Sequence, residues 1–202
     1  LFRSLLRDAS LGYTPPALEV LRDEPPFNDA GNASRLVQRY GQDLRHVEGV
    51  GWLRWTGAHW RVDQAGPQAE AEAVAEELRT STAEGEVGLA HRKWGLKLGN
   101  AGPLQAMIQL AAKRPEIRIA PEQLDADPWL LGTPGGTLDL RTGLLRPAAR
   151  EDLITRQTST APGWSRPASR FDRFLLEVMG GDPELAAYLL RFAGWALTGD
   201  TS

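Results

Sequence analysis

The chain has 202 residues, a formal net charge of −3 and a hydrophobic fraction of 42%, enough for one large domain or two small ones with a core. It has no cysteine, which excludes a disulfide framework, a cysteine zinc site and a thiol nucleophile, and its three scattered histidines argue against a histidine-rich metal site. No apolar run reaches the ~18 residues of a transmembrane helix, and no signal peptide is recognisable. We therefore expect no membrane partner and a cytoplasmic location.

Residues 1–30 are expected to form a linker or arm with one short helix. Residues 32–40 place apolar side chains at helical spacing, and Gly41 is the expected C′ residue of that helix. Aromatic and β-branched residues on both sides of Thr56-Gly57 predict a β-hairpin. Three helices are expected after it, at residues 67–84, 87–98 and 102–113.

The predicted hairpin contains three tryptophans within a stretch of nine residues, Trp52, Trp55 and Trp60. Aromatic side chains of this kind serve as stacking platforms for single-stranded bases in some proteins. More commonly they attach a hairpin to a neighbouring helix, and both interpretations stay open.

The second half of the chain predicts another hairpin, followed by a pair of helices. The glycine-rich run at residues 132–136 predicts a loop, and residues 137–140 and 144–146 flank a second turn. Apolar residues recur at helical spacing from residue 169 onward, until Gly180-Gly181 ends that helix. Asp182 is the expected N-cap of the last helix, with Pro183 in its first position.

No catalytic constellation is recognisable. The run at residues 132–136 lacks the Gly-Lys pair with which a P-loop reaches phosphates, so a tight turn is the better interpretation. Asp125, Asp127 and Asp139 could supply oxygen ligands to a metal ion, but a turn before Pro128 accounts for the first two without one. We expect no catalytic residue and no metal site in this chain.

Charged residues are gathered in blocks. Residues 62–90 sum to −6, residues 91–118 to +5 and residues 141–173 to +4. A basic block can form a phosphate-contacting surface, although a run of like charge is more commonly a solvated face. The pI of about 5.7 argues against a dedicated high-affinity nucleic-acid binder.

Three runs are distinctive in their order: NASRLVQRYGQDLRHVEGVGWLRWTGAHWRVD, LDADPWLLGTPGGTLDLRTGLLRPAAREDLIT and FDRFLLEVMGGDPELAAYLLRFAGWALTGDTS. Over residues 27–202 the chain resembles the domain directly N-terminal to the superfamily-3 helicase core, an AAA+ motor, in phage, plasmid and poxvirus primase–helicases. The family usually has asparagine at the positions of Gly132 and Gly135, and Ser-Gly-Asn where this chain has Leu98-Gly99-Asn100. If those asparagines make side-chain turn bonds, this chain relies on backbone freedom instead.

The resemblance implies a non-catalytic accessory domain in DNA replication, which links a primase to the helicase motor and assists DNA engagement or hexamer assembly. In relatives the final GWALTGD leads to the Walker A loop of the motor, whereas this chain stops before it. We therefore expect a piece of a longer ATP-dependent DNA helicase or primase, of phage or prophage origin in a bacterial host. The piece itself would have no cofactor, since ATP and Mg²⁺ belong to the motor. It would be a monomer, because the motor makes the hexamer contacts.

The fold class expected is α+β, mostly helical, with two β-hairpin regions and a final helical hairpin or collar. Its parts are an arm at 1–30, an accessory domain at 31–160 and the collar at 161–202. The candidate contacts to single-stranded or forked DNA are basic residues: Arg92, Lys93, Lys97, Lys113, Arg114, Arg141 and Arg146.

The alternative function is a protein-interaction module without DNA contact. In that case the acidic helix at 67–84 and the collar bind neighbouring subunits or a loader.

Overall fold

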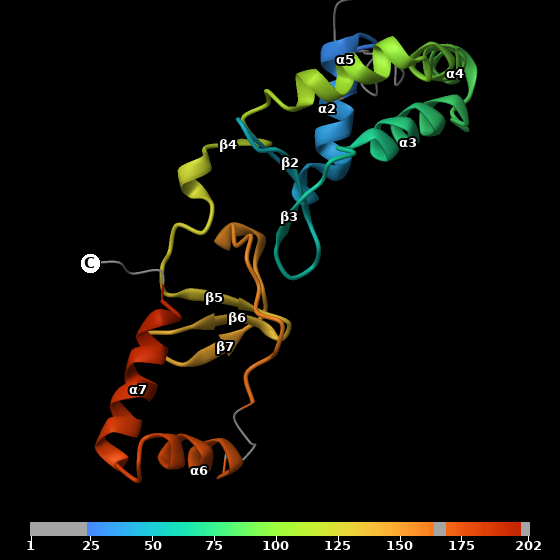
Figure 1. Ribbon diagram of the computed structural model, residues 1–202. Helices are drawn as coiled ribbons and strands as arrows, with labels where there is room; N and C mark the ends of the chain where they lie inside the picture. Colours follow the sequence, from blue (N-terminus) through green and yellow to red (C-terminus); the bar gives the residue numbers. More distant parts are fainter. Residues whose placement is uncertain (1–23, 164–168, 199–202) are drawn as a thin grey trace, which may run out of the picture. The chain divides into compact units, whose positions relative to one another are not determined.

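The computed structural model describes residues 24–163 and 169–198, which form six α-helices and two small sheets (Figure 1). The α+β, mostly helical fold class is confirmed. The short helix expected within residues 1–30 lies outside the described part of the chain. The chain divides into two compact units, residues 1–42 with 65–118, and residues 43–64 with 119–202.

Four helices build the first unit: α2 (Asp29–Tyr40), α3 (Gln68–Arg79), α4 (Gly85–Leu98) and α5 (Ala101–Ala111). The first turn of α2 is capped, because the side chain of Asn28 accepts a hydrogen bond from the amide of Gly31 at 2.8 Å. One side of α3 is a thin buried apolar stripe, which consists of Ala71, Val74, Ala75 and Leu78.

Two glycines in this unit allow close packing. A Cβ on Gly95 of α4 would lie 2.4 Å from the amide nitrogen of Arg79, so this approach of α4 to α3 requires glycine. Gly41 ends α2 as expected, but as its C-cap with a right-handed φ of −63° and not as the predicted C′ residue. A Cβ on Gly41 would instead lie 3.1 Å from the Val37 side chain and 3.3 Å from that of Ile117.

The first sheet has the strand order β3-β2-β1-β4, with β1 (Leu44–Val47), β2 (Gly51–Trp55), β3 (Trp60–Val62) and β4 (Arg118–Ile119). The antiparallel pair β2-β3 confirms the hairpin predicted around Thr56-Gly57. The strands β1 and β4 were not predicted, because both are short and neither shows a clear alternation of apolar and polar residues.

A buried cluster of Val47, Leu53 and Trp60 lies on one face of this sheet. Trp60 is fully buried, and its indole Nε1 donates to the carbonyl of Arg150 at 2.9 Å. Its backbone amide donates to the carbonyl of Ile154 at 2.8 Å. Trp60 therefore has the structural role that was the commoner of the two interpretations.

The second sheet has the order β5-β6-β7 and is antiparallel throughout, with β5 (Leu130–Thr133), β6 (Gly136–Asp139) and β7 (Leu144–Arg146). The predicted hairpin β6-β7 is confirmed, and the glycine-rich run is the tight turn between β5 and β6. Thr133 stabilises this turn, since its hydroxyl accepts the amide of Gly135 at 3.2 Å and donates to the carbonyl of Gly136 at 2.9 Å.

Only one of the three glycines of this turn has a positive φ. Gly136 has a φ of +129°, whereas Gly132 and Gly135 are not in the left-handed region, so the reliance expected at those two positions is wrong. Gly132 has a different purpose. A Cβ there would lie 2.4 Å from the carbonyl oxygen of Arg156.

The two remaining helices are α6 (Ser169–Val178) and α7 (Pro183–Ala196). The predicted cap is confirmed, because the Asp182 carboxylate accepts the amides of Glu184 and Leu185 at 2.9 and 3.1 Å. Much of the apolar stripe remains exposed, including Phe171, Phe174, Phe192 and Trp195. No helix in residues 24–163 or 169–198 is long and apolar enough to cross a membrane.

Candidate nucleic-acid interface

Five of the seven basic residues predicted to contact DNA lie in the first unit, on α4 or directly after α5, and two lie in the second unit. Their binding to DNA stays a prediction. The structure does show which of these side chains already have partners within the protein, and this separates them into two groups.

The two arginines of the first unit hold loops in place. Arg92 donates to the carbonyls of Ser81 and Ala83, at 3.0 and 3.3 Å, and so fastens the turn between α3 and α4. Arg114 donates to the carbonyl of Ala30 at 2.9 Å and to the hydroxyl of Ser34 at 3.0 Å, which ties the end of α5 to α2. Both guanidinium groups therefore have a structural role.

The three lysines of the first unit are exposed and have no carboxylate partner among the described residues, and we call them the open lysines. Lys93 and Lys113 are exposed, and neither side chain has a hydrogen bond or ion pair among the described residues. Lys97 lies one turn after Lys93 on α4, with its ammonium 4.7 Å from the ring centroid of Trp94. The indole of Trp94 donates to the buried side chain of Asn32 at 2.9 Å, which fixes the surface on which Lys97 rests.

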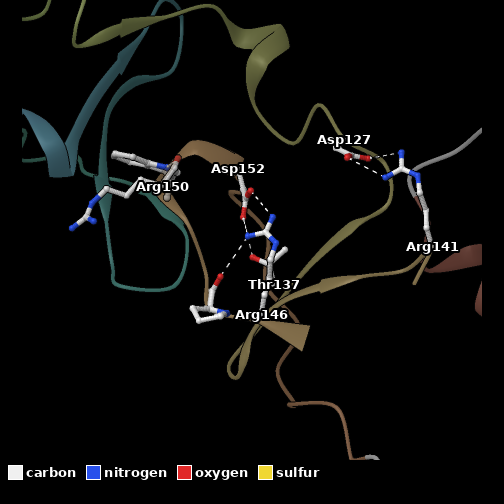
Figure 2. Close-up of polar contacts among 8 residues, drawn as sticks. Asp127, Thr137, Arg141, Arg146, Arg150 and Asp152 are labelled. Atoms are coloured by element: carbon white, nitrogen blue, oxygen red, sulfur yellow. Dashed lines mark hydrogen bonds and ion pairs between the residues drawn. The ribbon is translucent and has the colours of Figure 1, made fainter. Parts of the chain in front are cut away.

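The two arginines of the second unit are held by carboxylates, as Figure 2 shows. Arg146 binds both oxygens of Asp152 at 2.7 and 2.8 Å, and Asp152 also accepts the hydroxyl of Thr137 at 3.2 Å. Arg141 binds Asp127 more loosely, at 3.2 and 3.3 Å, and packs over the ring of Trp129. A carboxylate partner neutralises each of these charges, which weakens the case for phosphate contact.

Two pKa shifts follow from these contacts. The amide of Trp129 and then the guanidinium of Arg141 hold the pKa of Asp127 below its ordinary value, because both favour the carboxylate. The hydrogen bonds to Asp152 raise the pKa of Arg146 above its ordinary value. Each shift favours the charged form of the group concerned, the Asp127 carboxylate and the Arg146 guanidinium.

The aspartates considered as metal ligands have protein partners. Asp125 has a left-handed backbone with a φ of +49°, and its carboxylate accepts the amide of Thr155 at 2.7 Å and the hydroxyl of the same residue. Asp127 caps the turn that follows Pro128. Within the described ranges no group of three or more possible ligand side chains is arranged around a metal site.

One polar cluster was missed in the sequence. The imidazole of His91 lies 2.9 Å from the hydroxyl of Ser81 on one side and 2.9 Å from the carboxylate of Glu24 on the other. The order of groups is that of a catalytic triad, but the serine hydroxyl also accepts the amide of Ala83 and the imidazole packs edge-on against Phe27. These contacts fasten the segment before α2 to α4. Spacing in sequence carries no signal for a cluster drawn from residues 24, 81 and 91.

Two arginines outside the candidate set, Arg54 and Arg61, lie directly opposite each other on β2 and β3. The sequence alone could not place these two arginines side by side, because alternation along one strand does not show which residues of its partner strand lie opposite.

A family model described as D5 N-terminal like matches residues 33–180, which is most of the chain. No curated protein matches the chain. The matched segment begins within α2 and ends just after α6, so it includes both sheets and all the basic residues discussed above. The chain belongs to the D5 N-terminal-like family, the region that precedes the superfamily-3 helicase in primase–helicases.

Proposed function

We propose that this N-terminal domain links a primase to a superfamily-3 helicase motor of a phage or plasmid replication protein, and that the open lysines of its first unit contact DNA. The proposed DNA contact is supported by the difference between basic residues that have a partner within the protein and those that have none. Lys93, Lys97 and Lys113 have no carboxylate partner among the described residues, whereas the arginines of the candidate set have structural partners. Lysine ammonium groups without a partner are suited to phosphates, to which they add affinity without sequence preference.

The test compares two double variants that remove the same charge. Lys93→Gln/Lys97→Gln changes the proposed surface, and Arg39→Gln/Arg79→Gln changes two arginines that are paired with Glu77 and Glu76 of α3. Binding to a labelled duplex and to a labelled single strand is measured by fluorescence anisotropy at several salt concentrations.

The lysine variant is expected to bind duplex DNA more weakly, with a salt slope shallower by roughly 0.9 for each phosphate that the protein no longer neutralises. The arginine variant should keep the slope of the parent chain. Equal behaviour of the two variants would contradict the proposal, as would the absence of binding at low salt.

ATP hydrolysis belongs in this proposal to the helicase motor, together with ATP and Mg²⁺. The isolated chain is then expected to show no ATPase activity above background. Hydrolysis by the purified chain would place a nucleotide site within it and would refute this assignment.

A second candidate function is favoured by the helices α6 and α7. Among the described side chains of this pair only Leu175 and Ala186 are buried, and aromatic side chains such as Phe174 and Phe192 are 56% and 52% exposed. Exposed apolar surface of this density is typical of protein-interaction sites. As a protein-interaction module, the chain would bind neighbouring subunits or a loader through this surface.

Sedimentation distinguishes the two candidates. The accessory-domain proposal expects a monomer that binds DNA, since the motor supplies the ring contacts. The interaction-module proposal expects association that increases with concentration, is lost in Phe174→Glu/Phe192→Glu, and occurs without DNA affinity.

A further inference from the structure

The register of β1, β2 and β3 separates their side chains into two faces. Residues directly opposite each other on antiparallel strands share a face, and neighbours along a strand alternate. Leu53 pairs with Val62, and Trp55 pairs with Trp60, which places these residues on the face of the buried cluster. The other face is formed by the alternate residues, which are Leu44, His46, Trp52, Arg54 and Arg61.

This second face holds an excess of positive charge. Arg54 on β2 lies directly opposite Arg61 on β3, and like charges in that position destabilise a sheet. Asp63 compensates Arg54, which it binds at 2.8 and 2.9 Å. Arg61 is exposed and has no side-chain hydrogen bond or ion pair among residues 24–163 and 169–198. The charge of Arg61 on this face is therefore not compensated by any carboxylate among the described residues.

The same face presents aromatic rings beside that charge. His46 lies directly opposite Trp52, and their rings meet edge to face with centroids 5.2 Å apart. Trp52 is only partly buried, in contrast to the fully buried Trp60 on the other face. An indole held in place by a neighbouring ring is a rigid surface on which a flat ligand can stack.

The exposure of the side chains on this face increases from β1 to β3. Leu44 of β1 is buried, Trp52 of β2 is partly buried and Arg61 of β3 is exposed. β3 is the last strand in the order β3-β2-β1-β4, and its outer edge is bound at Trp60, whose amide donates to the carbonyl of Ile154. Because the arginine and the tryptophan lie on neighbouring strands of the same face, one bound chain can contact both.

From these features we propose that the face formed by His46, Trp52, Arg54 and Arg61 binds single-stranded DNA. A base stacks on Trp52 and a neighbouring phosphate contacts Arg61. The ligand must offer both a flat ring face and an anionic group, and single-stranded DNA offers both in each nucleotide. Duplex DNA does not fit, because its base faces are covered by their neighbours in the stack.

This inference extends the DNA contact of the proposed function to a second site and rests on the same role in replication. The two sites make different contributions. The lysines of the first unit bind phosphates of either form of DNA, whereas the sheet face requires unstacked bases.

The experiment measures the anisotropy of a labelled oligo-thymidine strand and of a duplex of equal length with the purified chain. Trp52→Leu keeps an apolar side chain without a stacking face, Trp52→Phe keeps an aromatic ring, and Arg61→Gln removes the charge. Arg79→Gln is the matched charge control, and Lys93→Gln/Lys97→Gln reports on the other site. Circular dichroism confirms that each variant is folded.

Trp52→Leu is expected to weaken single-strand binding by roughly five-fold or more, the usual loss when one stacked base loses its aromatic partner. Trp52→Phe should recover most of it. Arg61→Gln should weaken binding and lower the salt slope by roughly 0.7. Duplex binding should be unchanged in all three. If Trp52→Leu does not fold, Arg61→Gln, at an exposed edge position, carries the test.

The outcomes separate the two proposals. If single-strand binding responds to the lysine variant but not to the sheet variants, the inference is overturned and the proposed function stands. If it responds only to the sheet variants, the inference stands and the lysine surface is wrong. Absence of binding to either form of DNA overturns both.

Discussion

Replacing Asp152 by asparagine removes the charge that holds Arg146 while leaving the shape of the side chain unchanged. The carboxylate is only 11% exposed and the arginine side chain 42% exposed, with the two groups 2.7 and 2.8 Å apart at their paired atoms (Figure 2). Asparagine retains an oxygen that can accept the hydroxyl of the buried Thr137, so the loss is confined to the ion pair.

The size of the loss follows from this half-exposed geometry. Exposed ion pairs contribute about 0.2–1 kcal/mol, and removing one partner of a buried pair costs about 3–5 kcal/mol. Asp152→Asn is therefore expected to lower the free energy of unfolding by about 1.5–2 kcal/mol, between these two limits. The coupling energy with Arg146→Gln in a double-mutant cycle should be about 1 kcal/mol.

The Asp127–Arg141 pair, in the same unit, is the internal comparison. Its side chains are 39% and 51% exposed, and its hydrogen bonds are longer, at 3.2 and 3.3 Å. Its coupling energy should not exceed about 0.5 kcal/mol. Urea-induced unfolding followed by circular dichroism gives both cycles, with the slope of unfolding free energy against urea compared between variants.

Two results would refute the reasoning. One is a coupling between Arg146 and Asp152 no larger than that of the exposed pair. The other is a several-fold loss of DNA affinity in Arg146→Gln without loss of stability, since that would mean the arginine contacts phosphate rather than Asp152 in solution.

Two other predictions concern packing and pH. Gly95→Ala should lower the free energy of unfolding by about 2–3 kcal/mol, because the added Cβ meets the backbone of α3. Gly102→Ala in α5 should be neutral or stabilising by about 0.5 kcal/mol, because the Cβ there meets nothing within 4 Å. Equal urea midpoints for the two variants would contradict this. The depressed pKa of Asp127 contributes stability that is present above pH ~4 and is lost as the pH falls through the lower folded pKa. The difference in unfolding free energy between the parent chain and Asp127→Asn should therefore be largest at neutral pH and decline below pH ~4, and a difference that stays constant down to pH ~2.5 would show that the shift is absent.

The helices were predictable because their signals are local. The stripe of α3, the Asp182 cap of α7 and the Gly180-Gly181 stop between α6 and α7 each depend on residues within a few positions of one another. The strands β2, β3, β6 and β7 were found for the same reason, since tight turns mark both hairpins. The family resemblance, too, was present in the order of the sequence motifs.

Strand pairing at a distance was not predictable. β4 joins β1 across some seventy intervening positions, and the sequence offers no sign that residues 43–64 leave the first unit, because such pairing depends on packing and not on local pattern.

Composition and order alone determined that this chain is an α+β domain of the primase–helicase type with a clustered positive charge. The tertiary structure decided which of those charges are available. Arg92, Arg114 and Arg146 are indistinguishable in sequence from open basic residues, but their guanidinium groups bind carbonyls, a hydroxyl or a carboxylate contributed by other segments. Likewise Trp52 and Trp60 differ only in which face of a sheet they occupy, and the register between strands sets that face. The sequence specifies the chemical type of each side chain, but its partners depend on which distant segments the tertiary fold brings next to it.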